Sequence, residues 1–248
     1  MHGIIADRGR LVVLRRAARM PYRPGHWDLP DGPLAITESI EECLARQVSE
    51  ETGLIHEIGN WVIFQACKTA ASWPKDTRVA VNVSANQLRT AGLLSCIVNA
   101  LTESNLRPGR LELEITETAL IDQSEYVLAN LKALRDLGVR IALDDFGTGH
   151  SSLTYLRKLS PDSIKIEGSF VRDVLTDPGC ASIVKSVISL SKDLHINVVA
   201  EGIESPEQLS FIRNCGCNEG QGYFFCRPAS ANEIFEFMSN RNAAPHVA

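Results

Sequence analysis

The sequence contains no apolar run that approaches the roughly 20 residues a membrane span requires, and no apolar stretch near its start that suits a signal peptide. It also lacks any run of lysine or arginine, and its formal net charge is −5. We therefore expect a cytoplasmic protein that binds neither a membrane nor a nucleic acid backbone through a basic surface. A small anionic ligand held through metal ions is compatible with this composition.

The cysteines lack the spacing of a disulfide framework or a zinc site. There are seven of them, an odd number, and Cys215 and Cys217 form a Cys-x-Cys rather than a Cys-x-x-Cys pattern. This usage is typical of a protein that stays in a reducing compartment. We interpret the Cys215 and Cys217 pair as packing rather than chemistry.

The length of 248 residues fits one α/β barrel or two small domains. From residue 61 onward, short β-branched runs alternate with segments of helical period, which predicts parallel strands linked by crossover helices. Strands are expected at 78–84, 111–116, 139–146, 163–168, 196–203 and 219–225. Helices are expected near 61–71, 92–105, 124–137, 181–194 and 206–215.

Polar and charged residues stand at the ends of these predicted strands. Since the carboxyl ends of parallel barrel strands face one mouth, side chains distant in sequence would converge there. Any one of them alone is better explained as a solvated strand end or a helix cap. Carboxylates at four successive strand ends would repel one another without a cation, so the set predicts a metal site. The residues are Asn82, Ser84, Glu114, Glu117, Asp144, Asp145, Lys165, Glu201, Glu204 and Gln221.

The motifs "VNVSANQL", "LELEITET", "ALDDFGTGHSSLTYLRKL", "SIKIEGSFV", "VVAEGIESPEQL" and "GQGYFFCRP" occur in this order. In order and spacing they resemble the EAL domain, the cyclic-di-GMP phosphodiesterase family. The resemblance implies an α/β fold, a TIM-like (β/α) barrel. It also implies hydrolysis of cyclic-di-GMP to linear pGpG with two divalent metal ions, Mg²⁺ or Mn²⁺, and it is compatible with a homodimer.

The resemblance also implies residue roles. Asn82, Glu114, Asp144 and Asp145 would be metal ligands. Lys165 would orient the attacking water and offset phosphate charge, and Glu201 would be the general base. Glu117, Glu204 and Gln221 would support the loop, the ligand and the metal surroundings.

One part of the family pattern is missing. The Glu-Ala-Leu motif should lie on a strand upstream of "EETGLI" and supply a metal-binding glutamate, together with a ligand-binding arginine. Neither Glu-Ala-Leu nor Glu-x-Leu-x-Arg appears before Glu51 in a strand context. We therefore expect a barrel that is incomplete at its first strands and a metal site that lacks one ligand.

The segment in that place resembles part of a Nudix hydrolase. Gly32 is followed after five residues by Glu38 and after seven more by Arg46, and "QVSEETGL" completes the spacing of a Nudix box. Such a box places glutamates on one helix face to bind magnesium against a diphosphate, a role open here to Glu38, Glu50 and Glu51. The expected glutamate after Arg46 is replaced by Gln47, which damages this metal site.

We therefore divide the chain into a partial Nudix-like hairpin and helix over 1–54, an EAL-type barrel over 51–240 and a disordered tail over 241–248. The shared "EETGL" stretch suggests a recombination point, and the alternative is a divergent cap whose resemblance is accidental. Three functions stay open: a cyclic-di-GMP phosphodiesterase with impaired activity, a non-catalytic cyclic-di-GMP-binding module, and a Nudix-type nucleoside diphosphate hydrolase. A non-functional fusion product is a fourth interpretation.

Overall fold

The computed structural model describes residues 6–7, 10–11, 14–15, 27–28, 54–120, 125–147, 156, 158–217 and 219–241. The chain divides into two units, Met1–Gly59 and Asn60–Ala248. The first contains two antiparallel pairs of short strands, β1 (Ala6–Asp7) with β2 (Arg10–Leu11) and β3 (Leu14–Arg15) with β4 (Trp27–Asp28). The predicted helix over 38–52 and the box residues Glu38, Arg46, Glu50 and Glu51 lie outside the described residues. The Nudix-like segment thus stays a prediction.

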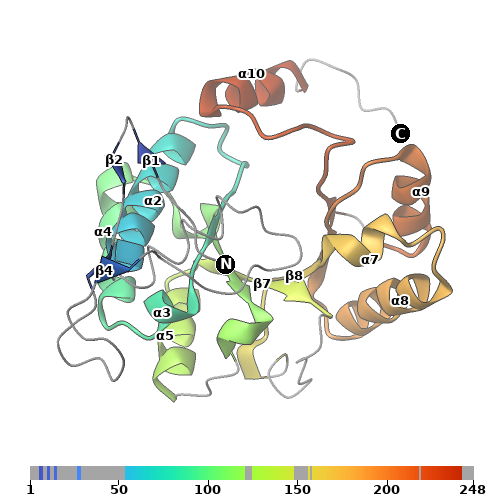
Figure 1. The fold of residues 1–248 in the computed structure, drawn as a ribbon, viewed down its shortest axis with the longest axis horizontal. Coiled ribbons are helices and arrows are strands. Elements are labelled where there is room, and N and C mark those ends of the chain that lie inside the picture. Colours follow the sequence, from blue (N-terminus) through green and yellow to red (C-terminus); the bar gives the residue numbers. More distant parts are fainter. Residues whose placement is uncertain are drawn as a thin grey trace. The chain divides into compact units, whose positions relative to one another are not determined.

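The second unit is built on a sheet of six parallel strands whose spatial order follows the chain. This confirms the predicted alternation of strands with crossover helices. The strands are β5 (Val79–Asn82), β6 (Leu111–Thr116), β7 (Arg140–Phe146), β8 (Ser163–Ile166), β9 (Asn197–Ala200) and β10 (Glu219–Gly220). Figure 1 labels two of these neighbouring strands, β7 (Arg140–Phe146) and β8 (Ser163–Ile166).

Helices connect these strands. The longer helices are α2 (Leu54–Ala71), α4 (Gly92–Ser104), α5 (Glu125–Asp136), α8 (Pro178–Asp193), α9 (Pro206–Asn214) and α10 (Ala231–Arg241). Short ones are α3 (Ala85–Leu88), η1 (Pro108–Arg110), η2 (Glu117–Leu120) and α7 (Gly168–Arg172). Helix α5 packs on β7, and helix α8 packs on β8 and β9. No helix among the described residues is long and apolar enough to cross a membrane. Of the predicted tail, Arg241 ends helix α10, and 242–248 lie outside the described residues.

The two faces of the sheet differ in chemistry. On β6, Leu111, Leu113 and Ile115 are fully buried and belong to the hydrophobic core. Glu112 and Glu114 alternate with them and point to the opposite, partly exposed face. One face therefore packs the core and the other presents polar side chains.

The sheet is strongly curved. Arg78 directly precedes the edge strand β5, and Glu219 lies on the other edge strand, β10. Their side chains nevertheless form an ion pair with 3.5 Å between Arg78 Nη2 and Glu219 Oε2. A flat sheet with four strands between them could not bring these residues together, since neighbouring strands lie about 4.8 Å apart. The six strands thus form a large part of a barrel wall with the polar face inside.

Four strands end earlier than predicted. The predicted strands 78–84, 163–168, 196–203 and 219–225 stop at Asn82, Ile166, Ala200 and Gly220. In the last case Phe225 and Cys226 donate backbone hydrogen bonds to the carbonyl of Gly222 and close a turn. The aromatic run after Gly220 has high β propensity, but this turn overrides it.

Candidate active site

Four neighbouring strands bring charged side chains to one region of the polar face. Glu114 on β6 pairs in register with Asn82 on β5, and Asp144 on β7 pairs with Thr116 on β6. Lys165 lies on β8, and Glu201 directly follows β9, where its N–H donates to the carbonyl of Ile166 at 3.2 Å. Parallel register therefore assembles residues that are up to 87 positions apart in the sequence.

Lys165 lies at the centre of this group. Its Nζ is 2.6 Å from Glu201 Oε1, 2.9 Å from Glu114 Oε1 and 3.3 Å from Asp144 Oδ1. The Lys165 side chain is 6% exposed, and the three carboxylates are 11–19% exposed. The two shorter contacts have the length of strong charge-assisted hydrogen bonds, so the ammonium fixes Glu201 and Glu114 relative to each other, and it forms an ion pair with Asp144.

The charges of the group do not balance. Glu114, Asp144, Asp145 and Glu201 are four carboxylates around one ammonium. Burial raises the pKa of Glu114, of Asp145 and of Glu201 above their usual values, and Asp144 raises each further by repulsion, while Lys165 opposes the shift. Burial alone would lower the pKa of Lys165, but Glu201, Asp144 and Glu114 raise it well above its usual range. The lysine stays charged, and the excess negative charge favours a further cation.

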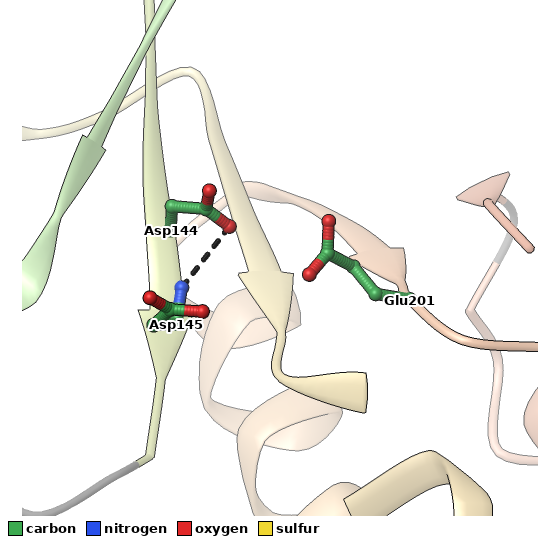
Figure 2. A group of neighbouring side chains, drawn as sticks. All are labelled: Asp144, Asp145 and Glu201. Atoms are coloured by element: carbon green, nitrogen blue, oxygen red, sulfur yellow. Dashed lines mark hydrogen bonds between the residues drawn. The ribbon is translucent and has the colours of Figure 1, made fainter. Parts of the chain in front are cut away.

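The arrangement fits a divalent metal ion. One oxygen from each of Asp144, Asp145 and Glu201 can be chosen so that all three lie within 4.8 Å of one another. Hard divalent cations bind oxygen at about 2.0–2.6 Å, so oxygens on one ion are no more than about 5 Å apart. Figure 2 shows Asp144 and Glu201 with their carboxyl groups facing each other, and Asp145 beside them. The oxygen donors and their spacing are therefore those that a divalent cation requires.

The local backbone around the two aspartates is unusual. Asp145 has a φ of 55°, and its N–H donates to Asp144 Oδ1 at 3.1 Å. A non-glycine residue with positive φ is uncommon, and aspartate is one of the residues that tolerates it. This bend breaks the strand alternation, so that two consecutive carboxylates can both contribute oxygens to the same cluster.

The other four predicted site residues lie at four different places in the fold. Asn82 ends β5 with its side chain exposed, and Glu117 is buried at the start of η2. Glu204 is exposed, and its N–H donates to Gln208 Oε1 at 2.8 Å, which places it at the start of α9. Gln221 is also exposed, and its backbone N–H donates to the carbonyl of Ala200 at 2.8 Å.

Sequence reasoning missed Glu167. This residue follows β8 by one position, and its charge helps to raise the pKa of Asp145, after burial and the repulsion from Asp144. Ser169 Oγ donates to its carboxylate. The sequence contained a signal for this residue, because Glu167 stands near the end of a predicted strand, as the predicted site residues do.

Comparisons with known proteins identify the family and the fold. The family model described as EAL domain matches residues 26–228, a range that includes the predicted Nudix box. An uncharacterized signaling protein of Caulobacter vibrioides is 46% identical over 187 residues, which are 75% of this chain and 23% of that protein. The bifunctional diguanylate cyclase/cyclic di-GMP phosphodiesterase MucR of Pseudomonas aeruginosa is 39% identical over 240 residues, which are 91% of this chain and 35% of that protein. The chain thus spans about a quarter to a third of these relatives.

Solved structures agree with this assignment. The structure of the PaMucR phosphodiesterase in complex with c-di-GMP has a TM-score of 0.73 at 39% identity and covers 75% of this chain and 77% of that chain. The manganese/cy-diGMP complex of Klebsiella pneumoniae BlrP1 has a TM-score of 0.68 at 31% identity and covers 77% of this chain and 49% of that chain. The matched relatives therefore include a c-di-GMP phosphodiesterase and a structure with a divalent metal. From the fold, the carboxylate cluster and these matches, the chain belongs to the EAL domain family.

Proposed function

We propose that this chain binds cyclic-di-GMP with divalent metal ions and hydrolyses it to linear pGpG at a reduced rate. The observation that carries the proposal is the convergence of Glu114, Asp144, Asp145 and Glu201 around Lys165. Family membership directs the choice of substrate, because relatives with this fold are cyclic-di-GMP phosphodiesterases or bind that molecule.

The oxygen donors of Asn82, Glu114, Asp144 and Asp145 would hold the cations, for which Mg²⁺ and Mn²⁺ are the proposed choices. When bound, such cations would polarise a phosphate oxygen and make a bound water more acidic. Lys165 would balance the charge of the phosphate and of the carboxylates that it contacts.

Glu201 would accept the proton of the attacking water. One of its oxygens lies within 4.8 Å of an oxygen of Asp144 and of Asp145, so a water held between the aspartates is in reach of this carboxylate. Burial raises the pKa of Glu201, which makes it a stronger base. The water oxygen bonds to phosphorus, one ring P–O bond breaks, and the leaving oxygen takes up a proton.

The reduced rate follows from the missing Glu-Ala-Leu motif. No such tripeptide occurs anywhere in the sequence. Positioning of metal ions supplies much of the rate in this kind of site, and the loss of one ligand weakens that positioning. We expect turnover at least about tenfold below that of an intact relative such as the MucR phosphodiesterase, since changes next to a metal typically reduce activity by about 10–100-fold.

The test is chromatographic detection of pGpG after incubation of the chain with cyclic-di-GMP and Mn²⁺. Glu201→Gln should lower the rate by about 100-fold or more, because general base catalysis contributes about 10²–10⁴. Glu207→Gln is the matched control, since Glu207 is exposed on α9 and contacts none of the cluster residues in the described part of the chain. Equal rates in the wild type and Glu201→Gln would refute the proposed role of Glu201.

Two other outcomes would change the assignment. Tight binding of cyclic-di-GMP without any product would make the chain a receptor rather than an enzyme. Hydrolysis of a nucleoside diphosphate derivative that survives Glu201→Ala and disappears in Glu51→Ala would place the activity in the Nudix-like segment.

A further inference from the structure

The turn that carries Glu201 is held between two neighbouring turns. It starts where β9 ends, at Ala200, and continues through Ile203, which is fully buried. On one side, the N–H of Glu201 donates to Ile166 on β8. On the other, the N–H of Ile203 donates to the carbonyl of Gln221 at 3.0 Å, and the N–H of Phe224 donates to the carbonyl of Ile203 at 3.0 Å. The position of Glu201 is thus set by backbone contacts from both directions.

Two glycines meet on the β8 side, and the close approach requires one of them, Gly202. Gly202 has a φ of 68°, and a Cβ on it would lie 3.1 Å from the Cα and 3.3 Å from the carbonyl oxygen of Gly168. An alanine at Gly202 would meet backbone atoms rather than a flexible side chain, and it would also adopt the left-handed conformation with strain. Either the turn or Gly168 would have to move, and Glu201 is the residue next to Gly202.

A third glycine allows the contact on the β10 side. A Cβ on Gly222 would lie 2.1 Å from the oxygen and 2.4 Å from the nitrogen of Ile203. No side chain of any size fits at that distance, so the turn after β10 can reach Ile203 only through glycine. The backbone bonds of Gln221 and Phe224 to this turn depend on the same close approach.

We propose that Gly202 and Gly222 are positioning residues that hold the Glu201 carboxylate at the metal cluster and against Lys165. The inference rests on the proposed function for the role of Glu201 in catalysis, but the position of the carboxylate is measurable without metal or substrate. A change at either glycine would act on metal binding through Glu201, whose carboxylate adds negative charge beside the proposed ligands Asp144 and Asp145. Neither glycine touches the reacting atoms.

The experiment compares four alanine variants of the full chain. Gly202→Ala is the perturbation. Gly216→Ala is the matched control for backbone strain, because Gly216 has a φ of 93° but a Cβ there meets nothing within 4 Å. Gly168→Ala is the control for the contact itself, since its Cβ would approach Gly202 no closer than 3.6 Å, an ordinary contact distance. Gly222→Ala is the same perturbation from the β10 side, and a folded Gly222→Ala protein that keeps the Glu201 signal would overturn the role of Gly222.

Two quantities are measured for each folded variant. The first is the ¹³C signal of the Glu201 carboxyl carbon in metal-free protein, assigned as the signal lost in Glu201→Gln. The second is the dissociation constant for Mn²⁺, from the electron paramagnetic resonance signal of the free ion. The proposal expects Gly202→Ala to shift the Glu201 signal and weaken Mn²⁺ binding at least tenfold. It expects Gly216→Ala and Gly168→Ala to keep the signal and stay within twofold of the wild type.

An unmoved Glu201 signal in Gly202→Ala would overturn the proposal, and so would an equal loss of Mn²⁺ affinity in Gly216→Ala. A shifted signal with unchanged Mn²⁺ affinity would overturn it too. If the wild type binds no Mn²⁺, the proposed function fails, and the carboxyl signal in metal-free protein alone decides whether the glycines position Glu201.

Discussion

The ammonium of Lys165 contacts three carboxylates at once, and replacement of Lys165 by methionine removes this shared positive charge. The side chain is 6% exposed and lies 2.6–3.3 Å from Glu201, Glu114 and Asp144. Methionine keeps most of the side-chain volume, so the change removes the charge with little change in packing. Three buried carboxylates are then left without their shared counter-charge.

The expected loss is large in metal-free protein. Each contact is worth about 6 kcal/mol of Coulomb attraction at an effective dielectric constant of about 20. Burying the ammonium offsets several kcal/mol of that sum, and removal of one partner from a buried charge pair typically costs about 3–5 kcal/mol. For a chain of this size, that loss lowers the midpoint of thermal unfolding by roughly 6–20 °C. A divalent cation should restore part of it, because it supplies positive charge to the same carboxylates.

The assay is urea unfolding followed by circular dichroism, once in EDTA and once in Ca²⁺. Lys185→Met is the matched control, because Lys185 is exposed on α8 and its ammonium lies 5.5 Å from the centre of the Phe211 ring. Such an exposed contact contributes about 1 kcal/mol or less. If Lys165→Met in EDTA loses no more stability than Lys185→Met, or if Ca²⁺ stabilises Lys165→Met less than it stabilises the wild type, the electrostatic account of the cluster is wrong.

Three further outcomes are expected. Arg110→Met should lower the free energy of unfolding by about 2–4 kcal/mol, because the buried guanidinium donates to Thr77 and Ala70 carbonyls at 2.7 Å each, whereas exposed Arg107→Met should have little effect in the same urea assay. Leu113→Ala should cost about 2–5 kcal/mol, since this fully buried side chain would leave a cavity, and a smaller loss would show that the core collapses around it. In metal-free protein, Asp145→Asn should raise the free energy of unfolding more at pH 7 than at pH 4. Burial and the repulsion from Asp144 and Glu167 raise the pKa of Asp145 in the folded state. The stability contributed by protonated Asp145 is therefore present below the unfolded pKa of about 4 and is lost as pH rises through the folded pKa. A gain that is equal at both pH values would instead reflect relief of the positive φ of Asp145.

Much of the fold was predictable because its determinants are local. The predicted strand 111–116 matches β6 because leucine and glutamate alternate there at the two-residue period of a strand with one buried face. The strands β8 to β10 end earlier than predicted because the chain turns beside Gly168, Gly202 and Gly222. Those turns depend on close approaches between distant backbones, which no local pattern records.

The convergence of the charged side chains was predictable from the sequence, but their individual contacts were not. Asp144, Asp145 and Glu201 converge as expected from parallel strand ends. That Lys165 bonds three carboxylates at once depends on the curvature and register of four strands. Glu204 illustrates the limit, because the turn at Gly202 carries it to the start of α9, where it is exposed to solvent.

Binding of cyclic-di-GMP to the carboxylate cluster should depend on divalent metal ions, whether or not hydrolysis follows quickly. This dependence is measured by calorimetric titration of cyclic-di-GMP into the chain in Ca²⁺ and again in EDTA. We expect one molecule bound per chain in Ca²⁺ and at least about a tenfold loss of affinity in EDTA, since the cations link the phosphates to the protein. Equal affinity in EDTA, or no binding in Ca²⁺, would refute the proposed site.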